Sequence, residues 1–301
     1  MIQAVAPLFA IVVAAHAAAV ASVATTAFAP NLIAAVPGIV LCLVVTRPIA
    51  RAGLVVGGLA VVMTLLAPGL DGVHRWMPLG PLTVHASAAV WPWLCAGLFD
   101  SDRRWRRLGV VVVVVVQLVH GLQPDAAQAT VLAVAVVPVL WSTDRAVGVV
   151  VGLLAAMTWW RADPLAPILH VEEIGTPIAA LGLGAIVVAG LAVAVLFMPM
   201  LLAFRWAPAL SSLLLRASIA AFVCAALGRF AVPVFGAGAG PVLGWYAMLS
   251  VLRLHQPTPS TRSSLSTDIS NDSRLSDVQR TTFTLKPPVD NAPYKRTHNG
   301  R

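Results

Sequence analysis

The side chains best suited to chemistry in this 301-residue chain gather in three short polar segments between long apolar runs. The most acidic segment, residues 161–175, contains the adjacent acids Glu172 and Glu173. A carboxylate that is desolvated against apolar helices has a raised pKa and can take a proton from a hydroxyl group as a general base. Both acids are therefore candidates for a catalytic base. The alternative is that they cap a helix and pair with an arginine.

A second polar segment, residues 69–85, combines Arg75 and Trp76 with turn-forming glycine and proline. Tryptophan favours the headgroup level of a membrane, and arginine pairs with lipid phosphate. Composition alone therefore favours an interfacial anchor, with a ligand-binding loop as the alternative.

The third segment is short and contains Gln123 and Asp125. Asp125 comes at the start of a predicted helix, where a carboxylate complements the positive end of the helix dipole. An N-terminal cap and a place in the wall of a polar cavity remain equal alternatives for this residue.

The rest of the chain must position these segments within a membrane. Hydrophobic residues make up 59% and charged residues only 11% of the sequence, well below the roughly 25% charged residues of a soluble domain. The net charge of +8 comes from cations that flank apolar runs, which is typical of membrane loops and argues against nucleic acid as a partner. The three cysteines all lie inside apolar runs, so we interpret them as small core residues.

Hydropathy predicts an all-α integral membrane protein with about ten transmembrane helices. The predicted spans are residues 5–29, 32–46, 52–67, 84–99, 108–122, 127–141, 146–160, 177–200, 208–228 and 241–253. With the N-terminus inside, nine arginines flank the spans on the inner side and three, Arg75, Arg161 and Arg229, on the outer side. This bias predicts that both termini are cytoplasmic and that the three polar segments face outward.

A change of composition divides the chain into a membrane domain, residues 1–255, and a tail, residues 256–301. The tail is rich in Ser, Thr, Pro and charge and has few apolar residues, so it cannot bury enough surface to offset the entropy of ordering. We predict that it is a disordered cytoplasmic extension.

Three short motifs resemble those of the SEDS family, the shape, elongation, division and sporulation polymerases related to FtsW and RodA. Residues 75–87, RWMPLGPLTVHAS, resemble its RWI-x-LG-x-x-x-x-QPSE stretch, and residues 122–129, LQPDAAQA, resemble LQPDLGTA. Residues 170–172, HVE, look like the counterpart of an HTD or HSD stretch whose aspartate is the family's proposed catalytic base. Two departures stand out: HASA replaces QPSE, which removes a glutamate, and the membrane domain is shorter than is usual for the family.

The resemblance implies ten helices with both termini inside and a polymerase that joins lipid-linked sugar units into peptidoglycan, usually beside a transpeptidase. It implies a multi-pass protein of the inner (plasma) membrane, with a role in cell shape or cell division. Glu172 takes the place of the catalytic acid. The substrate-binding residues that we predict are Arg75, Trp76, Gln123, Asp125, Arg161, His170 and Arg229, with the arginines holding the diphosphate.

A non-catalytic scaffold or lipid-binding protein with the same fold is the main alternative, because the QPSE glutamate is missing. A transporter has less support, since no pair of broken helices is related as repeats. Histidines at the outer helix ends, with nearby acids, could also hold a divalent cation such as Zn²⁺ or Mn²⁺, although no HExxH or comparable spacing occurs, and we predict no specific metal ligands. Arg216 lies inside a span, where we expect it to face inward and meet an acid or a lipid phosphate.

Overall fold

The computed structural model describes residues 2–70, 72–80, 82–161, 165–228 and 230–256. The chain divides into Met1–Gln256 and Pro257–Arg301. Of the predicted tail, only Gln256 is among the described residues. Arg229 and the acids Asp71 and Asp163 also lie outside the described residues.

Helices make up the described fold almost entirely. Seven helices are long and apolar enough to cross a membrane: α1 (Ile2–Val20), α2 (Ala29–Val44), α3 (Arg47–Met63), α5 (Arg103–Leu122), α6 (Ala126–Thr143), α9 (Leu183–Ala203) and α10 (Pro208–Ala226). The short 3-10 helix η1 (Thr25–Phe28) extends α2, and η2 (Thr64–Leu66) extends α3. Three shorter apolar helices complete a set of ten: α4 (Ala86–Leu98), α7 (Arg145–Thr158) and α11 (Ala239–Leu254). The predicted all-α, multi-pass membrane fold is confirmed.

Three predicted boundaries are wrong in informative ways. The predicted span at 5–29 overruns α1, which ends at Val20, and includes η1, which leads into α2. The predicted span at 177–200 is interrupted, because the six-residue helix α8 (Gly175–Ala180) ends before Gly182, which has φ of +89°, and α9 begins at Leu183. The predicted loop before α4 contains a hairpin of β1 (Trp76–Leu79) and β2 (Leu82–His85), so the helix starts at Ala86 and not at residue 84. The antiparallel register places Trp76 opposite His85.

Polar caps start the helices that carry the polar segments. Asp102, Asp125 and Asp144 accept hydrogen bonds from backbone N–H groups in the first turns of α5, α6 and α7. The side chain of His85 does the same for α4. Such caps satisfy N–H groups that have no partner inside the helix. Asp125 therefore forms the N-terminal cap that was one of the two alternatives for this residue.

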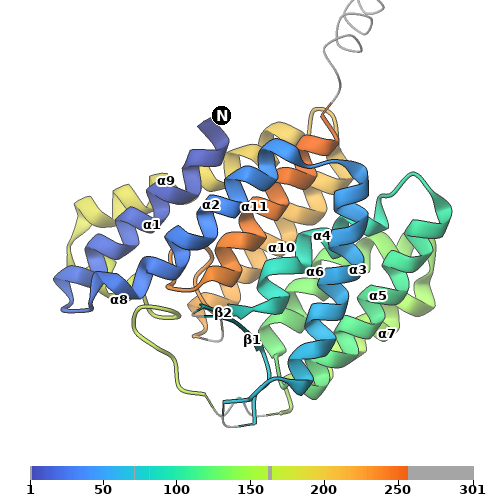
Figure 1. The fold of residues 1–301 in the computed structure, drawn as a ribbon, viewed down its shortest axis with the longest axis horizontal. Coiled ribbons are helices and arrows are strands. Elements are labelled where there is room, and N and C mark those ends of the chain that lie inside the picture. Colours follow the sequence, from blue (N-terminus) through green and yellow to red (C-terminus); the bar gives the residue numbers. More distant parts are fainter. Residues whose placement is uncertain (1, 71, 81, 162–164, 229, 257–301) are drawn as a thin grey trace, which may run out of the picture. The chain divides into compact units, whose positions relative to one another are not determined.

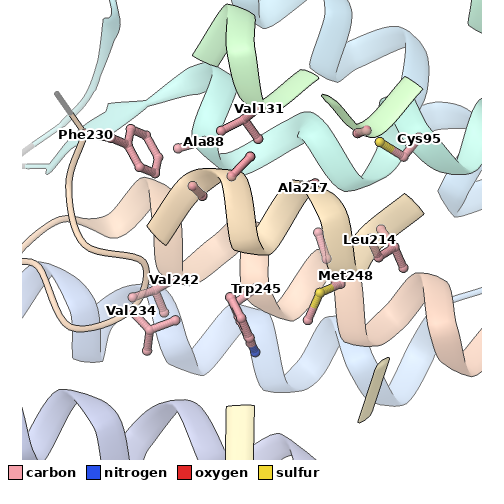
Figure 2. Packing of buried hydrophobic residues seen from close by; sticks show 14 of the residues in the cluster. Ala88, Cys95, Val131, Leu214, Ala217, Phe230, Val234, Val242, Trp245 and Met248 are labelled. Carbon is pink, nitrogen blue, oxygen red and sulfur yellow. The ribbon is translucent and has the colours of Figure 1, made fainter. Parts of the chain in front are cut away.

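Helix α11 packs against both α2 and α4 and occupies the middle of the described membrane domain. A side chain at Gly244 would place its Cβ 2.0 Å from the Ala88 carbonyl oxygen, so glycine is needed where α11 meets α4. Figure 2 shows the surrounding apolar cluster, in which side chains from α4, α6, α10 and α11 pack together. This core holds the helix ends that present the polar segments.

Two of the polar segments lie on the same side of the helices. Figure 1 shows the β1–β2 hairpin and the chain leading to α8 on one side, with the start of α1 and the end of α11 on the other. An even number of spans brings both ends of the membrane domain to the same side, which agrees with ten helices.

Candidate functional site

Arg75 is the first charged residue of the site and lies directly before β1. Only 7% of the residue is exposed. Its Nη2 donates a hydrogen bond to the Pro124 carbonyl oxygen at 2.8 Å, and its Nε lies 3.7 Å from Asp125 Oδ2. The hairpin thus brings the predicted RW and QPD motifs into direct contact.

Asp125 lies behind the hairpin and is 1% exposed. Its Oδ1 accepts the Gln128 N–H at 3.1 Å, and its Oδ2 faces Arg75 Nε and, at 3.5 Å, His85 Nε2. Burial by itself raises the pKa of Asp125, but the nearby Arg75, followed by His85 and His120, outweighs burial and holds the pKa below its ordinary value. Asp125 is therefore an ionised, buried counter-charge.

His85 ends β2 and connects the hairpin to α4. Its Nδ1 accepts a hydrogen bond from the Ala88 N–H at 3.4 Å, which leaves Nε2 to carry the proton toward Asp125. Burial lowers the pKa of His85, and Arg75 adds to this effect while Asp125 opposes it. The imidazole is therefore neutral near pH 7, and its role is to orient Asp125 and the start of α4.

A second buried polar layer lies next to these groups. His120 Nε2 is 2.9 Å from Ser87 Oγ, and Gln123 Nε2 donates to Thr64 Oγ1. All four residues are buried. The sequence analysis missed Thr64, because a threonine at the end of an apolar span carries no signal that separates it from an ordinary helix end.

Glu172 belongs to a tight turn that precedes α8. Its Oε2 accepts a hydrogen bond from the Ile168 N–H at 2.8 Å, and the Ile168 carbonyl accepts in return from the backbone N–H of Glu172 at 2.9 Å. Glu172 is half-buried, whereas Glu173 is exposed. The turn therefore partly buries Glu172 and leaves the adjacent Glu173 exposed to solvent.

A polar cavity of about 480 Å³ connects the hairpin with this turn. Most of its lining is apolar, and we name it the polar cavity after the side chains of Arg75, Thr83, His85 and Glu172; Trp76 and Phe230 also line it. The ring of His85 meets Trp76 and Phe230 edge-on, with centroids 6.0 Å apart in each pair. A space of this size suits a small polar or amphiphilic group.

A larger apolar groove of about 850 Å³ runs between α8, α9 and α10. We define the apolar groove by Ile178, Ile186, Val193 and Phe222, and its polar end contains Glu172 and Glu173. Glu172 lines both this groove and the polar cavity. Glu172 therefore lies between a groove lined by apolar side chains of α8, α9 and α10 and a cavity whose lining also includes Arg75 and His85.

The predicted site residues do not all meet in the cavity. Arg75, Trp76 and Glu172 line it, while Gln123 and Asp125 lie in the buried layers behind Arg75. Arg161 is exposed, and its Nη1 donates to the Gly121 carbonyl at the end of α5, at 2.6 Å. His170 offers its backbone carbonyl to the Ala237 N–H, and Arg229 lies outside the described residues.

Two further features that the sequence raised are a divalent-cation site and Arg216. The described residues include no group of three or more His, Cys, Asp or Glu arranged to hold a metal ion. Arg216 does not meet an acid in the described part of the chain. Instead, Nη1 donates to Ser212 Oγ at 2.8 Å and Nη2 to the Ala135 carbonyl at 3.4 Å. Arg216 thus joins α10 to α6.

Comparison with solved structures identifies the fold, although no family model and no curated protein matches the chain. The Rod shape determining protein RodA of Thermus thermophilus is 18% identical, with a TM-score of 0.58, over 85% of this chain and 97% of that chain. An aspartate-to-alanine mutant of that protein is 18% identical to this chain, with a TM-score of 0.57 and the same coverage of both chains. A chain solved in a study of how a peptidoglycan synthase complex coordinates polymerization and crosslinking is 17% identical, with a TM-score of 0.54, over 83% of this chain and 97% of that chain. The chain therefore has the RodA fold, and its resemblance to the SEDS family is confirmed at the level of the fold.

Proposed function

We propose that this chain is a SEDS-like glycosyltransferase that builds a cell-envelope glycan, of the peptidoglycan type, from a polyprenyl-diphosphate-linked sugar at the outer leaflet of the plasma membrane. One observation carries the proposal: Glu172 lines both the apolar groove and the polar cavity. A lipid-linked sugar needs both compartments, since its isoprenoid must stay in apolar surroundings while its diphosphate and sugar need polar ones. The fold shared with RodA supports the same reaction class.

In the reaction, Glu172 is the general base. A hydroxyl oxygen of the acceptor sugar attacks the anomeric carbon of the donor, and the bond from that carbon to the diphosphate oxygen breaks. The hydroxyl proton passes to the Glu172 carboxylate, and the polyprenyl diphosphate leaves with the electron pair. A carboxylate in the wall of a cavity that is partly closed to water is suited to this transfer.

Arg75 holds the diphosphate in this proposal, because a guanidinium fork matches phosphate oxygens. Trp76 offers an apolar face to the sugar ring beside it. Gln123 and Asp125 act from behind Arg75, where Asp125 fixes the charge and the orientation of the guanidinium. Roles in binding for Arg161, His170 and Arg229 remain predictions from sequence.

A partner is also part of the proposal. One structural neighbour belongs to a peptidoglycan synthase complex that polymerizes and crosslinks. By analogy, we propose that this chain works beside a transpeptidase.

A non-catalytic scaffold is the second candidate function. It is favoured by the hydrogen bond and ion pair that already join Arg75 to Pro124 and Asp125 inside the protein, and by the absence of the QPSE glutamate. A chain that keeps the fold but not the reaction would retain such a buried network for stability alone.

An assay of product formation by the purified protein with a lipid-linked sugar donor distinguishes the glycosyltransferase from the non-catalytic scaffold. Glu172→Gln keeps size and hydrogen bonding but removes the proton acceptor, so turnover should fall roughly 10²–10⁴-fold. Donor binding should be kept, and the exposed neighbour Glu173→Gln is the matched control. Arg75→Lys should instead weaken donor binding, because a point charge replaces a fork. If the unmodified protein forms no product with any such donor and all variants bind alike, the scaffold is the correct interpretation.

A further inference from the structure

A buried asparagine on α2 holds a loop that is distant in sequence. Asn31 is fully buried near the outer end of α2. Its Nδ2 donates to the Gly236 carbonyl at 2.9 Å and to the Val234 carbonyl at 3.4 Å, while its Oδ1 accepts the Gly238 N–H at 2.6 Å. One amide thus uses both its donor and its acceptor on the same short loop between α10 and α11, which we call the 234–238 loop.

One residue of this loop and one residue shortly before it hold the backbone directly before Glu172. The Val232 N–H donates to the Val171 carbonyl at 3.0 Å, and the Ala237 N–H donates to the His170 carbonyl at 2.8 Å. These two bonds fix the two residues that precede Glu172 in the chain. Asn31 is therefore connected to the catalytic segment by a continuous path of hydrogen bonds.

The conformation of the 234–238 loop needs such an external anchor. Val234 has φ of +68°, a left-handed conformation that a β-branched residue adopts only at a cost of roughly 1–3 kcal/mol. The strain persists only where surrounding contacts over-determine the backbone. The hydrogen bonds from Asn31 to residues 234, 236 and 238 are such contacts.

We propose that Asn31 is a positioning residue for Glu172: it fixes the 234–238 loop, which in turn holds the backbone of residues 170–171 and keeps the Glu172 carboxylate in the wall of the polar cavity. This inference rests on the proposed function, since a positioning role requires that Glu172 takes part in the reaction. The competing interpretation is that Asn31 only stabilises the packing of α2.

A double-mutant cycle tests the role in turnover. Asn31→Leu keeps the branched shape of the side chain and removes all three hydrogen bonds. We expect kcat to fall roughly 10²-fold with KM for the lipid-linked donor almost unchanged, because a small displacement of a catalytic group costs about this much. In a Glu172→Gln background the same substitution should cause no further loss. An equal additional loss in that background overturns the proposal. Asn31→Ser supplies one hydroxyl that can donate or accept a hydrogen bond, so it should lose less, and it serves if Asn31→Leu does not fold.

The matched control is Ser250→Ala on α11. Ser250 is also fully buried and donates to the Tyr246 carbonyl at 2.8 Å, at the opposite end of the interface between α2 and α11. Its loss should leave kcat within about threefold. If Ser250→Ala lowers kcat as much as Asn31→Leu does, any disturbance of the interface between α2 and α11 lowers turnover. That result would reject the positioning role of Asn31.

Amide hydrogen exchange separates failure of this inference from failure of the proposed function. In Asn31→Leu, exchange should rise in residues 230–238 and 168–173, while α2 and α11 stay protected. Unchanged exchange in both segments overturns the inference whatever the activity. A rise in both segments, in a protein whose unmodified form makes no product, supports the structural path and rejects the glycosyltransferase function alone.

Discussion

The polar cavity has two walls that are held by different physical means. On the hairpin side, Arg75, Asp125 and His85 are mostly buried and interact through charged and polar side chains. On the opposite side, Glu172 is half-buried on a turn that backbone hydrogen bonds connect to the 234–238 loop. The first wall is part of the folding core, while the second is attached to it through a loop.

Because of this difference, we expect mutations in the first wall to affect mainly stability and mutations in the second wall to affect mainly turnover. Charges that are buried in the first wall must be satisfied for the chain to fold, so changes there affect the free energy of unfolding first. Changes in the second wall shift a half-exposed carboxylate and should affect turnover first. A stability assay and an activity assay should therefore rank variants of the two walls in opposite orders.

The largest effect on stability is expected for Asp125→Asn. The substitution removes the negative charge that faces Arg75 and His85 at a site that is 1% exposed. Breaking a buried charge pair by neutralising one partner costs about 3–5 kcal/mol. Thermal unfolding in detergent should show a large fall in Tm, or no folded protein.

Asp100→Asn is the control for that prediction. Arg51 and Asp100 form a closer ion pair, at 2.8 Å, but their side chains are 28% and 13% exposed. The Arg51 hydrogen bond lowers the pKa of Asp100, yet a pair that water still reaches contributes only about 1 kcal/mol or less. If Asp100→Asn destabilises as strongly as Asp125→Asn, burial is not what distinguishes the hairpin wall.

Gly236→Ala tests the second wall directly. A Cβ at this position would lie 2.4 Å from the Val171 carbonyl oxygen, so the turn that carries Glu172 must move. We expect a stability loss of about 1–3 kcal/mol from overpacking, together with a clear fall in kcat. Gly190→Ala on α9, where an added Cβ meets nothing within 4 Å, is the matched control. Full activity of Gly236→Ala would mean that the two walls are not separated as we describe.

The pH dependence of stability should report on the hairpin wall. Because the folded-state pKa of His85 is below its ordinary value of 6.5, the unfolded chain takes up a proton first as the pH falls, and stability is lost below about pH 6.5. The lowered pKa of Asp125 acts in the same direction below about pH 3.8. His85→Gln, which introduces the residue that the SEDS motif has there, should flatten the loss of Tm between pH 7 and pH 5. An equal slope in both proteins would contradict this assignment.

The sequence predicted the membrane fold and one wall of the cavity better than the other. Apolar run lengths indicated ten helices, and two local motifs indicated Arg75 and Asp125, whose positions depend on nearby helix ends. Asn31 was missed, because it lies between two predicted spans and its partners are more than 200 residues away. The hairpin was missed as well, since strands of four residues next to proline and glycine show too short an alternation to be recognised.

The smallest effect is expected for Arg161→Gln, and it decides whether this residue belongs to either wall. Arg161 is exposed, and its Nη1 donates to the Gly121 and Leu122 carbonyls at the end of α5, where a cation complements the negative end of the helix dipole. Loss of that interaction should cost about 0.3–1 kcal/mol, visible as a small fall in Tm. If the arginine also holds the donor diphosphate, as the resemblance implies, KM for the lipid-linked donor should rise at the same time. Added salt screens the charge of Arg161, so the difference in KM between Arg161→Gln and the unmodified protein should shrink at high salt. An unchanged KM at low salt would assign Arg161 to the helix end alone and leave Arg75 as the cation that contacts the donor among the residues tested.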